Sequence, residues 1–330
     1  MSILSRIGLR RKKARDFAVA ENAPERANQI YYRMAGKKRH AHATWYRGEN
    51  TNFHPMRESL AEPGAVERYI GQGWFPAEPF ISKDTYITAF GSCFAAEVTR
   101  FLLANGYRVF GDDLRLDAHV IRSGEGIVNT AAVRQQFEWA FDGRAPVSAV
   151  WHDKDGAQVP VSAEIREATR GIFEKTDVFI LTLGLSEVWC DKITGDVFWR
   201  AVPREHFDPA RHGFRVLGAE ENRQNLTAIY RKIRTHRPEA RIVLTLSPVP
   251  LAATFRPVSC VTANSVSKAS LRIAIDEVVR EFSADDRLHY FPSYEMVTSF
   301  IDNPMGPDLR HPRRETVDAI METFKRHYLR

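Results

Sequence analysis

The sequence has few cysteines and no long hydrophobic run, and each absence excludes a class of protein. Its three cysteines, Cys93, Cys190 and Cys260, form no CxxC pair and no metal-ligand spacing, which argues against a disulfide framework and predicts free thiols. No stretch approaches the roughly 18 consecutive apolar residues that a membrane-spanning helix needs. The first residues also lack the apolar core of a secretory signal. We therefore expect a cytoplasmic protein.

The sequence also lacks the short motifs that bind common cofactors. It contains no phosphate-binding loop of the P-loop pattern and no dinucleotide fingerprint after its first predicted strand. Its His and Cys residues form no zinc-binding pattern. Kinases, dehydrogenases and metalloenzymes are therefore poor candidates, and we expect no cofactor and no bound metal.

Acidic residues are scarce at the amino-terminal end. Residues 1–48 carry 12 Lys and Arg against 3 Asp and Glu, whereas the remaining residues carry 35 against 38, so the net charge of +6 comes from this segment. Such a stretch is typical of a basic, flexible arm that is simply solvated. It also suits electrostatic contact with an anionic membrane surface, a nucleic acid or a polysaccharide. No specific nucleic acid is expected as a partner, and both interpretations stay open.

Beyond this arm the sequence pattern changes twice. Residues 49–85 are rich in Pro, Gly and aromatic residues without a sustained period, and we interpret them as an irregular lead-in that packs on the domain. From residue 86 to residue 330, strand and helix patterns alternate. Strands are expected at 85–90, 107–111 and 288–295, and at the start of 177–189 and of 240–250, each of which ends in a loop. Helices are expected at 93–105, 129–141, 222–238, 264–283 and 313–329.

This alternation predicts an α/β domain with a doubly wound, mostly parallel sheet. The apolar runs at 177–183 and 240–246 are typical of strands that are buried on both faces. Ligands bind such sheets at the carboxyl ends of the strands. Unusual residues follow three of the predicted strands at that edge: Gly91-Ser92-Cys93, residues 184–187, and Ser247-Pro248. Their convergence predicts a functional site.

Two neighbouring nucleophiles, Ser92 and Cys93, stand where the first predicted strand turns into a helix. A side chain in the first turn of a helix faces unpaired N–H groups and the positive end of the helix dipole. This environment favours a thiolate and stabilises the oxyanion that forms when a hydroxyl or thiol attacks an ester. The alternative is that Ser92 caps the helix and Cys93 fills a small buried space. The tripeptide alone leaves both interpretations open.

A nucleophile needs a general base, and His311 has the most suggestive context of the 11 histidines. Asp308 precedes it by three residues, just before the last predicted helix. At this spacing a carboxylate on a turn can bind its own histidine and fix the tautomer of the ring. The second ring nitrogen then faces a nucleophile. We predict that His311 is a base and that Asp308 orients it.

These two motifs resemble those of the GSCFA family, which is named after the pentapeptide at residues 91–95. The segments TLGLSEVW, TLSPVPL, NSVSKASLR and YFPSYE are also similar to blocks of that family. The resemblance covers about residues 50–325. It implies a branch of the SGNH (GDSL-like) hydrolase superfamily with a flavodoxin-like three-layer α/β/α sandwich.

The same resemblance implies a reaction. The expected activity is ester hydrolysis or O-acyl transfer through a covalent acyl-enzyme, with Cys93 or Ser92 as nucleophile. The implied substrate is a small-molecule or glycan ester, such as a carbohydrate ester, and a transferase would also need an acyl donor. The first block of SGNH enzymes has the sequence Gly-Asp-Ser, in which the serine is the nucleophile. An alignment of this block with Gly91-Ser92-Cys93 without a gap places Cys93 at the nucleophile position, whereas a shift of one residue places Ser92 there.

The oxyanion-binding blocks of the superfamily are altered in this sequence. The third block normally supplies an asparagine in a Gly-x-Asn pattern, and Ser186 stands at that position, two residues after Gly184. The second-block glycine corresponds to Gly126, and Asn129 lies close to it in the sequence. A weaker hydroxyl donor or another residue must therefore stabilise the oxyanion.

Two further side chains are expected near the site. Glu187 follows a buried strand and either orients His311 or a substrate hydroxyl, or caps the adjacent turn. Asn264, with Lys268 in the same segment, either binds substrate oxygens at a helix start or serves as an ordinary cap. The tryptophans Trp74, Trp189 and Trp199 suit either a sugar-stacking platform or core packing.

A competing hypothesis concerns the whole protein. The altered first block and the missing third-block asparagine also suit a non-catalytic carbohydrate-binding or scaffold protein that retains the fold. Turnover of an acyl ester would favour the enzyme, whereas a glycan ligand without turnover would favour the binding protein.

Overall fold

The computed structural model describes residues 16–18, 29–35, 37–42, 52, 54–55, 57–91, 93–110, 127–146, 162–199 and 201–330. The chain divides into two compact units, residues 1–69 and residues 70–330, and each is described by itself. The first unit contains an antiparallel sheet of three strands, β1 (Asp16–Ala18), β2 (Gln29–Met34) and β3 (Lys37–His42), and the short helix η3 (Glu58–Ala61). The predicted boundaries at residues 48 and 85 stay predictions.

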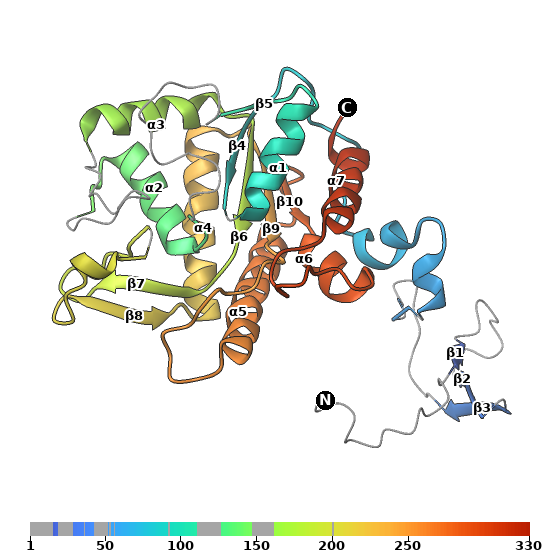
Figure 1. The fold of residues 1–330 in the computed structure, drawn as a ribbon. Helices are drawn as coiled ribbons and strands as arrows, with labels where there is room; N and C mark the ends of the chain where they lie inside the picture. Colours follow the sequence, from blue (N-terminus) through green and yellow to red (C-terminus); the bar gives the residue numbers. More distant parts are fainter. Residues whose placement is uncertain are drawn as a thin grey trace. The chain divides into compact units, whose positions relative to one another are not determined.

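The second unit is built on a parallel sheet of five strands in the order β10-β9-β6-β4-β5 (Figure 1). These strands are β4 (Tyr86–Phe90), β5 (Arg108–Val109), β6 (Val178–Leu183), β9 (Arg241–Leu246) and β10 (Leu288–Phe291). All four neighbouring pairs are parallel. Counted along the chain and read from β5, the order is the 2-1-3-4-5 of flavodoxin-like folds. The predicted α/β class is confirmed.

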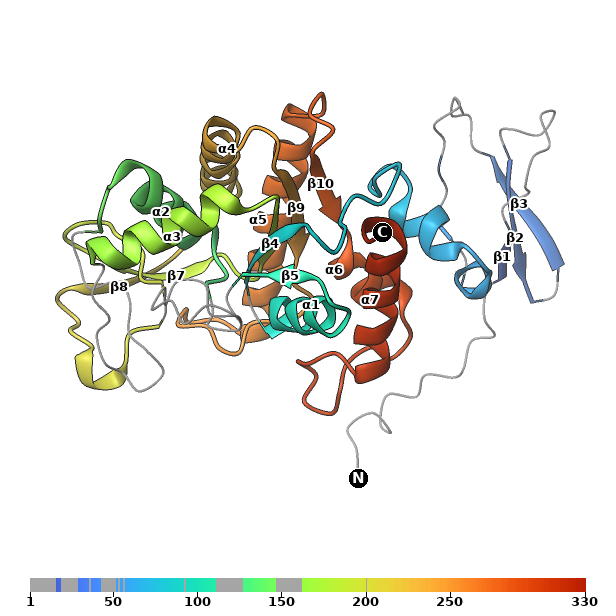
Figure 2. The same cartoon turned by 90° about the horizontal axis from the view of Figure 1, so that it is seen from above.

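Helices cover both faces of this sheet. Figure 2 shows α1 and α7 on one side of the strands and α4 and α5 on the other, which confirms the predicted three layers. The longer helices are α1 (Cys93–Ala104), α2 (Thr130–Asp142), α3 (Ala163–Lys175), α4 (Ala219–His236), α5 (Cys260–Glu281) and α7 (Arg314–Tyr328). The shorter ones are η4 (Glu67–Gly71), η6 (Arg204–His206), α6 (Ser293–Glu295) and η7 (Met296–Phe300). No described helix is both long and apolar enough to cross a membrane.

The central strands are buried on both faces, as their unbroken apolar runs predict. All six residues of β6 are buried. Phe179, Leu181 and Leu183 alternate toward one core cluster, which also contains Phe137 of α2 and Phe173 of α3. The rings of Phe137 and Phe173 stack with their centroids 4.5 Å apart. Burial of each such side chain stabilises the fold by about 1.5–3 kcal/mol, so the end of β6 is held firmly.

A hairpin of β7 (Glu187–Asp191) and β8 (His212–Val216) is inserted between β6 and α4. The predicted buried strand at 177–183 and the loop after it at 184–187 match β6 and the turn that follows it, whereas the hairpin itself is not predicted. The chain leaves the sheet after Leu183, and Glu187 starts a separate antiparallel pair. The carboxylate of Asp191 fixes the hairpin end by accepting from Arg211 at 2.5 Å and from the amide of Ile193 at 2.8 Å.

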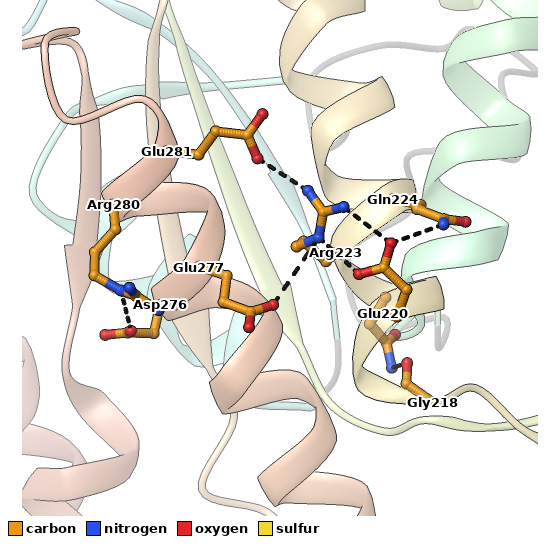
Figure 3. A network of polar contacts seen from close by, with 9 residues as sticks. Gly218, Glu220, Arg223, Gln224, Asp276, Glu277, Arg280 and Glu281 are labelled. Atoms are coloured by element: carbon orange, nitrogen blue, oxygen red, sulfur yellow. Dashed lines mark hydrogen bonds and ion pairs between the residues drawn. The ribbon is translucent and has the colours of Figure 1, made fainter.

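An exposed polar network joins the outer faces of α4 and α5 (Figure 3). Arg223 of α4 donates to Glu220 of the same helix at 2.8 and 2.9 Å and to Glu281 of α5 at 3.0 Å. The hydrogen bonds from Arg223, and then from Gln224, lower the pKa of Glu220 to about 2. Because exposed pairs contribute little to stability, the apolar side of the two helices carries their packing.

Candidate active site

The turn that carries the candidate nucleophiles begins at Gly91, where only glycine fits. Its φ is +141°, a conformation that side chains rarely adopt. A Cβ at this position would stand 2.5 Å from the carbonyl oxygen of Thr182 and 2.6 Å from its Cβ. Gly91 therefore lets the chain turn against the end of β6 before α1 begins.

Cys93 is the first residue of α1, and it is an exposed free thiol. The interpretation of Cys93 as a small buried filler is therefore wrong. The thiol stands at the end of a 12-residue helix whose first N–H groups have no partner within the helix. Ser92 and Gly126 lie outside the described residues, so their predicted roles stay predictions.

Asp308 and His311 form the pair that their spacing predicts. Nδ1 of His311 lies 2.6 Å from Oδ2 of Asp308, and Oδ1 accepts from the amides of Arg310 and His311 at 3.0 Å each. These hydrogen bonds, above all the one from the His311 ring, hold the pKa of Asp308 well below its usual range. The ionised carboxylate accepts the Nδ1 proton, so Nε2 is the basic nitrogen.

The loop that carries this pair is closed by backbone hydrogen bonds. The amide of Gly306 donates to the carbonyl of His311 at 2.8 Å, and the amide of Arg313 donates to the carbonyl of Pro304 at 2.8 Å. The side chains of Asp308 and His311 are each about half exposed, at 51% and 50%. The loop therefore presents the pair to solvent from a fixed backbone.

A cavity of about 420 Å³ brings together residues from distant segments. It lies at the carboxyl end of the sheet, because the loops after β4, β6 and β9 all contribute to its walls. Its polar lining comprises Cys93, Asn129, Gly184, Glu187 and Arg310. Among the residues described, Asp308 and His311 do not line it, although Arg310 lies between them in the sequence.

Aromatic side chains form one wall of this cavity. Trp189 and Trp199 both line it, together with Phe214 and Phe255. Trp189 contacts Phe214 and Phe255 edge-on, with centroids 5.2 and 4.9 Å apart. Trp74 does not take part, since it packs edge-on against a tyrosine of β10. Trp199 is 2% exposed and packs against Trp139 with ring centroids 5.9 Å apart, so Trp189 alone of the three candidate tryptophans is available to a ligand.

Asn129 lines the cavity and caps α2, as its position in the sequence predicts. Its Oδ1 accepts from the amide of Ala132 at 2.8 Å, and the residue is 5% exposed. Because the cap uses the oxygen, the NH₂ group is the part of this side chain that can donate to a ligand. Asn129 therefore suits the oxyanion role that the altered third block leaves open.

The loop after β6 uses its predicted oxyanion donors internally. The amide of Gly184 donates to the carbonyl of Val128 at 2.7 Å. Ser186 is fully buried: its amide donates to Oγ of Ser267 at 2.7 Å, and its hydroxyl donates to the carbonyl of Ser267 at 3.0 Å. In this arrangement neither Gly184 nor Ser186 has a proton to offer an oxyanion.

Lys268 holds two of the cavity loops together, which differs from both roles expected for its segment. It is 2% exposed, and Nζ donates to the carbonyls of Gly184, Ser247 and Val249 at 2.7, 2.7 and 2.8 Å. Burial lowers its pKa to about 7, whereas the three carbonyls favour the ammonium form. Lys268 therefore fixes the loops after β6 and β9 and does not bind substrate oxygens.

Glu187 and Asn264 also take defined positions. The side chain of Glu187 is 3% exposed; Oε2 accepts from Thr254 at 2.7 Å, and Oε1 lies 3.6 Å from Arg256. Oε1 has no hydrogen-bond partner among the described residues. Asn264 accepts from the amide of Leu251 at 3.1 Å, so it holds the loop after β9. Glu187 alone of these two lines the cavity.

The described part of the chain brings no three His, Cys, Asp or Glu side chains close enough to hold a metal ion.

No curated protein matches the chain. Several solved structures resemble it distantly, among them two esterases. A carbohydrate esterase family 3 protein from Talaromyces cellulolyticus is 10% identical over 73% of this chain and 94% of its own, with a TM-score of 0.35. An acetyl xylan esterase from the rumen bacterium Butyrivibrio proteoclasticus is 12% identical over 73% and 64%, with a TM-score of 0.33. Neither likeness is close enough to support an argument about activity.

The family match is stronger and covers most of the chain. The model of the GSCFA family matches residues 86–324, which run from the start of β4 into α7. The matched segment includes the pentapeptide at residues 91–95 and the Asp308–His311 pair. This protein therefore belongs to the GSCFA family.

Proposed function

We propose that this protein is an SGNH-like esterase or O-acyltransferase that works through a covalent acyl-enzyme. The observation that carries the proposal is that Cys93 and Arg310, the residue before His311, line the same cavity. The two motifs are far apart in the sequence, yet both reach one site. Together with the Asp308–His311 hydrogen bond, they supply a nucleophile, a base and an orienting group.

In the first step, Nε2 of His311 takes the thiol proton as Sγ of Cys93 bonds to the ester carbonyl carbon. Negative charge develops on the carbonyl oxygen, to which Asn129 and the first N–H groups of α1 donate. Asp308 stabilises the imidazolium and does not take its proton. His311 then protonates the leaving alkoxide, the C–O bond breaks, and a thioester on Cys93 remains.

In the second step, a hydroxyl group attacks the thioester carbonyl. His311 takes the hydroxyl proton and returns it to the sulfur of Cys93 as the C–S bond breaks. Water gives a carboxylic acid, whereas an acceptor alcohol gives a new ester, so the hydrolase and the transferase share every residue named. A carbohydrate ester is a suitable substrate because the half-buried ring of Trp189, in the wall of the cavity, offers a surface on which a sugar can pack. Ser92 is the alternative nucleophile.

Variants at the three central positions test this proposal. Loss of the general base in His311→Ala should lower kcat/KM toward an accepted ester by about 10²- to 10⁴-fold. Cys93→Ala should abolish labelling by thiol-directed acyl probes, and Ser92→Ala should not. Full activity of the His311→Ala variant would overturn the proposal.

The competing candidate is a non-catalytic binding protein. It is supported by the loop after β6, where the donors of Gly184 and Ser186 are already used by other protein groups. This candidate predicts no turnover of a broad panel of acyl esters together with a clear ligand on a glycan array. Turnover that depends on His311 would exclude it.

A further inference from the structure

Arg310 places a charged side chain at the cavity. It carries the only positive charge among the described residues that line the cavity. Its Nε is buried, and no described residue accepts a hydrogen bond from it. Folded proteins normally satisfy buried N–H groups, because an unpaired one is costly. Among the described residues, its guanidinium therefore keeps a donor that a ligand in the cavity can satisfy.

The backbone before Arg310 adopts an unfavourable conformation. Leu309 has a φ of +55°, in the left-handed region that residues with a side chain avoid. Its own side chain is 77% exposed and gains no burial from this conformation. The amide of Arg310 donates to Oδ1 of Asp308 at 3.0 Å, which holds the turn in place. This backbone turn leaves the side chain of Leu309 in solvent and lets the side chain of Arg310 reach the cavity.

The second charged residue of the cavity does not neutralise Arg310. Glu187 accepts from Thr254 at 2.7 Å, and its other oxygen pairs with Arg256 at 3.6 Å. The positive charge of Arg310 therefore faces a cavity whose walls are mostly aromatic and aliphatic. Attraction between opposite charges is stronger in such surroundings than in water. A guanidinium group binds carboxylate or phosphate with two parallel N–H bonds.

We infer that Arg310 binds an anionic group of the substrate, a carboxylate or a phosphate, inside the cavity. The apolar walls then hold the body of the same molecule. The anion site follows from the cavity and Arg310 alone, whereas the identity of the ligand as an ester rests on the proposed function. The protein acts on esters that carry an anionic group in their acyl or alcohol part, and Arg310 determines this specificity.

Unreactive ligands test the anion site without catalysis. Trp189 and Trp199 line the cavity, so intrinsic fluorescence of the full-length protein reports binding. The probes are hexanoate against hexanamide, and hexyl phosphate against hexanol, so that each anion has a neutral partner with the same chain. Anion binding should be at least about tenfold tighter, should weaken with added salt, and should reveal whether carboxylate or phosphate is preferred.

Three variants locate the effect. Arg310→Gln should lose the preference for the anion, and Arg310→Lys should keep part of it because the charge remains. Arg314→Gln is the matched control, since Arg314 pairs with Asp318 at 2.9 Å and does not line the cavity; it should behave like the parent. Thermal melting verifies that each variant is folded.

The outcomes separate this inference from the proposed function. Equal binding of anionic and neutral probes by the parent, or a preference that survives in Arg310→Gln, would overturn the anion site. Turnover of neutral and anionic esters at equal kcat/KM would also overturn it while leaving the esterase proposal intact. An anion preference without turnover of any ester would contradict the esterase and support the anion site.

Discussion

Gly91 controls the geometry of the nucleophile turn through sterics alone. Gly106 offers a matched control, because its φ is +76° but a Cβ there would meet nothing within 4 Å. Gly106→Ala should cost about 1 kcal/mol of unfolding free energy for the positive φ. Gly91→Ala adds the clash with Thr182 and should cost about 2–4 kcal/mol. Urea unfolding measures both, and equal losses would contradict the steric argument.

In the proposed mechanism, Asp308 acts on the chemistry through the tautomer of His311. Asp308→Asn keeps the shape of the side chain but removes the charge that holds the Nδ1 proton. We expect kcat for an accepted ester to fall by about 10²- to 10⁴-fold. The melting temperature should hardly change, because both side chains are about half exposed. A variant with parental kcat would show that Asp308 does not orient the base.

At the scale of elements, Lys268 connects α5 to the loops after β6 and β9. Lys268→Met leaves three buried carbonyls without their donor, and we expect it to lower the unfolding free energy by about 3–5 kcal/mol. Ser265→Ala is the control on the same helix, since Ser265 is exposed, and should stay within about 0.5 kcal/mol of the parent. Similar unfolding curves for the two variants would show that the hydrogen bonds from Lys268 to these loops do not stabilise the fold.

Most of the sheet follows from the sequence, and the elements that do not follow have physical reasons. The predicted helix at 93–105 and the central strands match the structure closely because their patterns are long and regular. The hairpin β7–β8 is missed because its two short strands pair across residues 192–211, so no local pattern marks them as neighbours. Helix α3 is not predicted, and only Thr169, Ile172 and Phe173 of its 13 residues are buried.

The candidate site follows from the sequence only in part. Cys93, Asn129, Gly184 and Glu187 line one cavity because they follow strands whose carboxyl ends meet. The aromatic wall and Arg310 depend on how a hairpin and a loop fold over that edge, which no local pattern encodes. Lys268 leaves a usable signal: it shares the buried face of α5 with Leu271 and Ile275, at helical spacing.

At the scale of the whole molecule, His289 couples stability to pH. Burial, and then the charge of Arg241, lowers its pKa to about 4, below the ordinary value of about 6.5. The unfolded chain therefore binds the proton more tightly between pH 6.5 and pH 4, and stability falls as the pH drops through this window. His289→Phe keeps the stacking on Phe80. Between pH 6.5 and pH 4 the variant should lose about 1–3 kcal/mol less of its unfolding free energy than the parent loses. Parallel stability curves for parent and variant would contradict this assignment.

The intact mass of the protein after incubation with an activated acyl ester tests the covalent mechanism most directly. We predict a gain of one acyl group, located by peptide mapping to the segment that carries residues 92–93 and released by neutral hydroxylamine, as expected of a thioester on Cys93. The adduct should be absent in Cys93→Ala and should form much more slowly in His311→Ala. Turnover of the ester by the parent with no acyl group ever found on that segment would contradict the account.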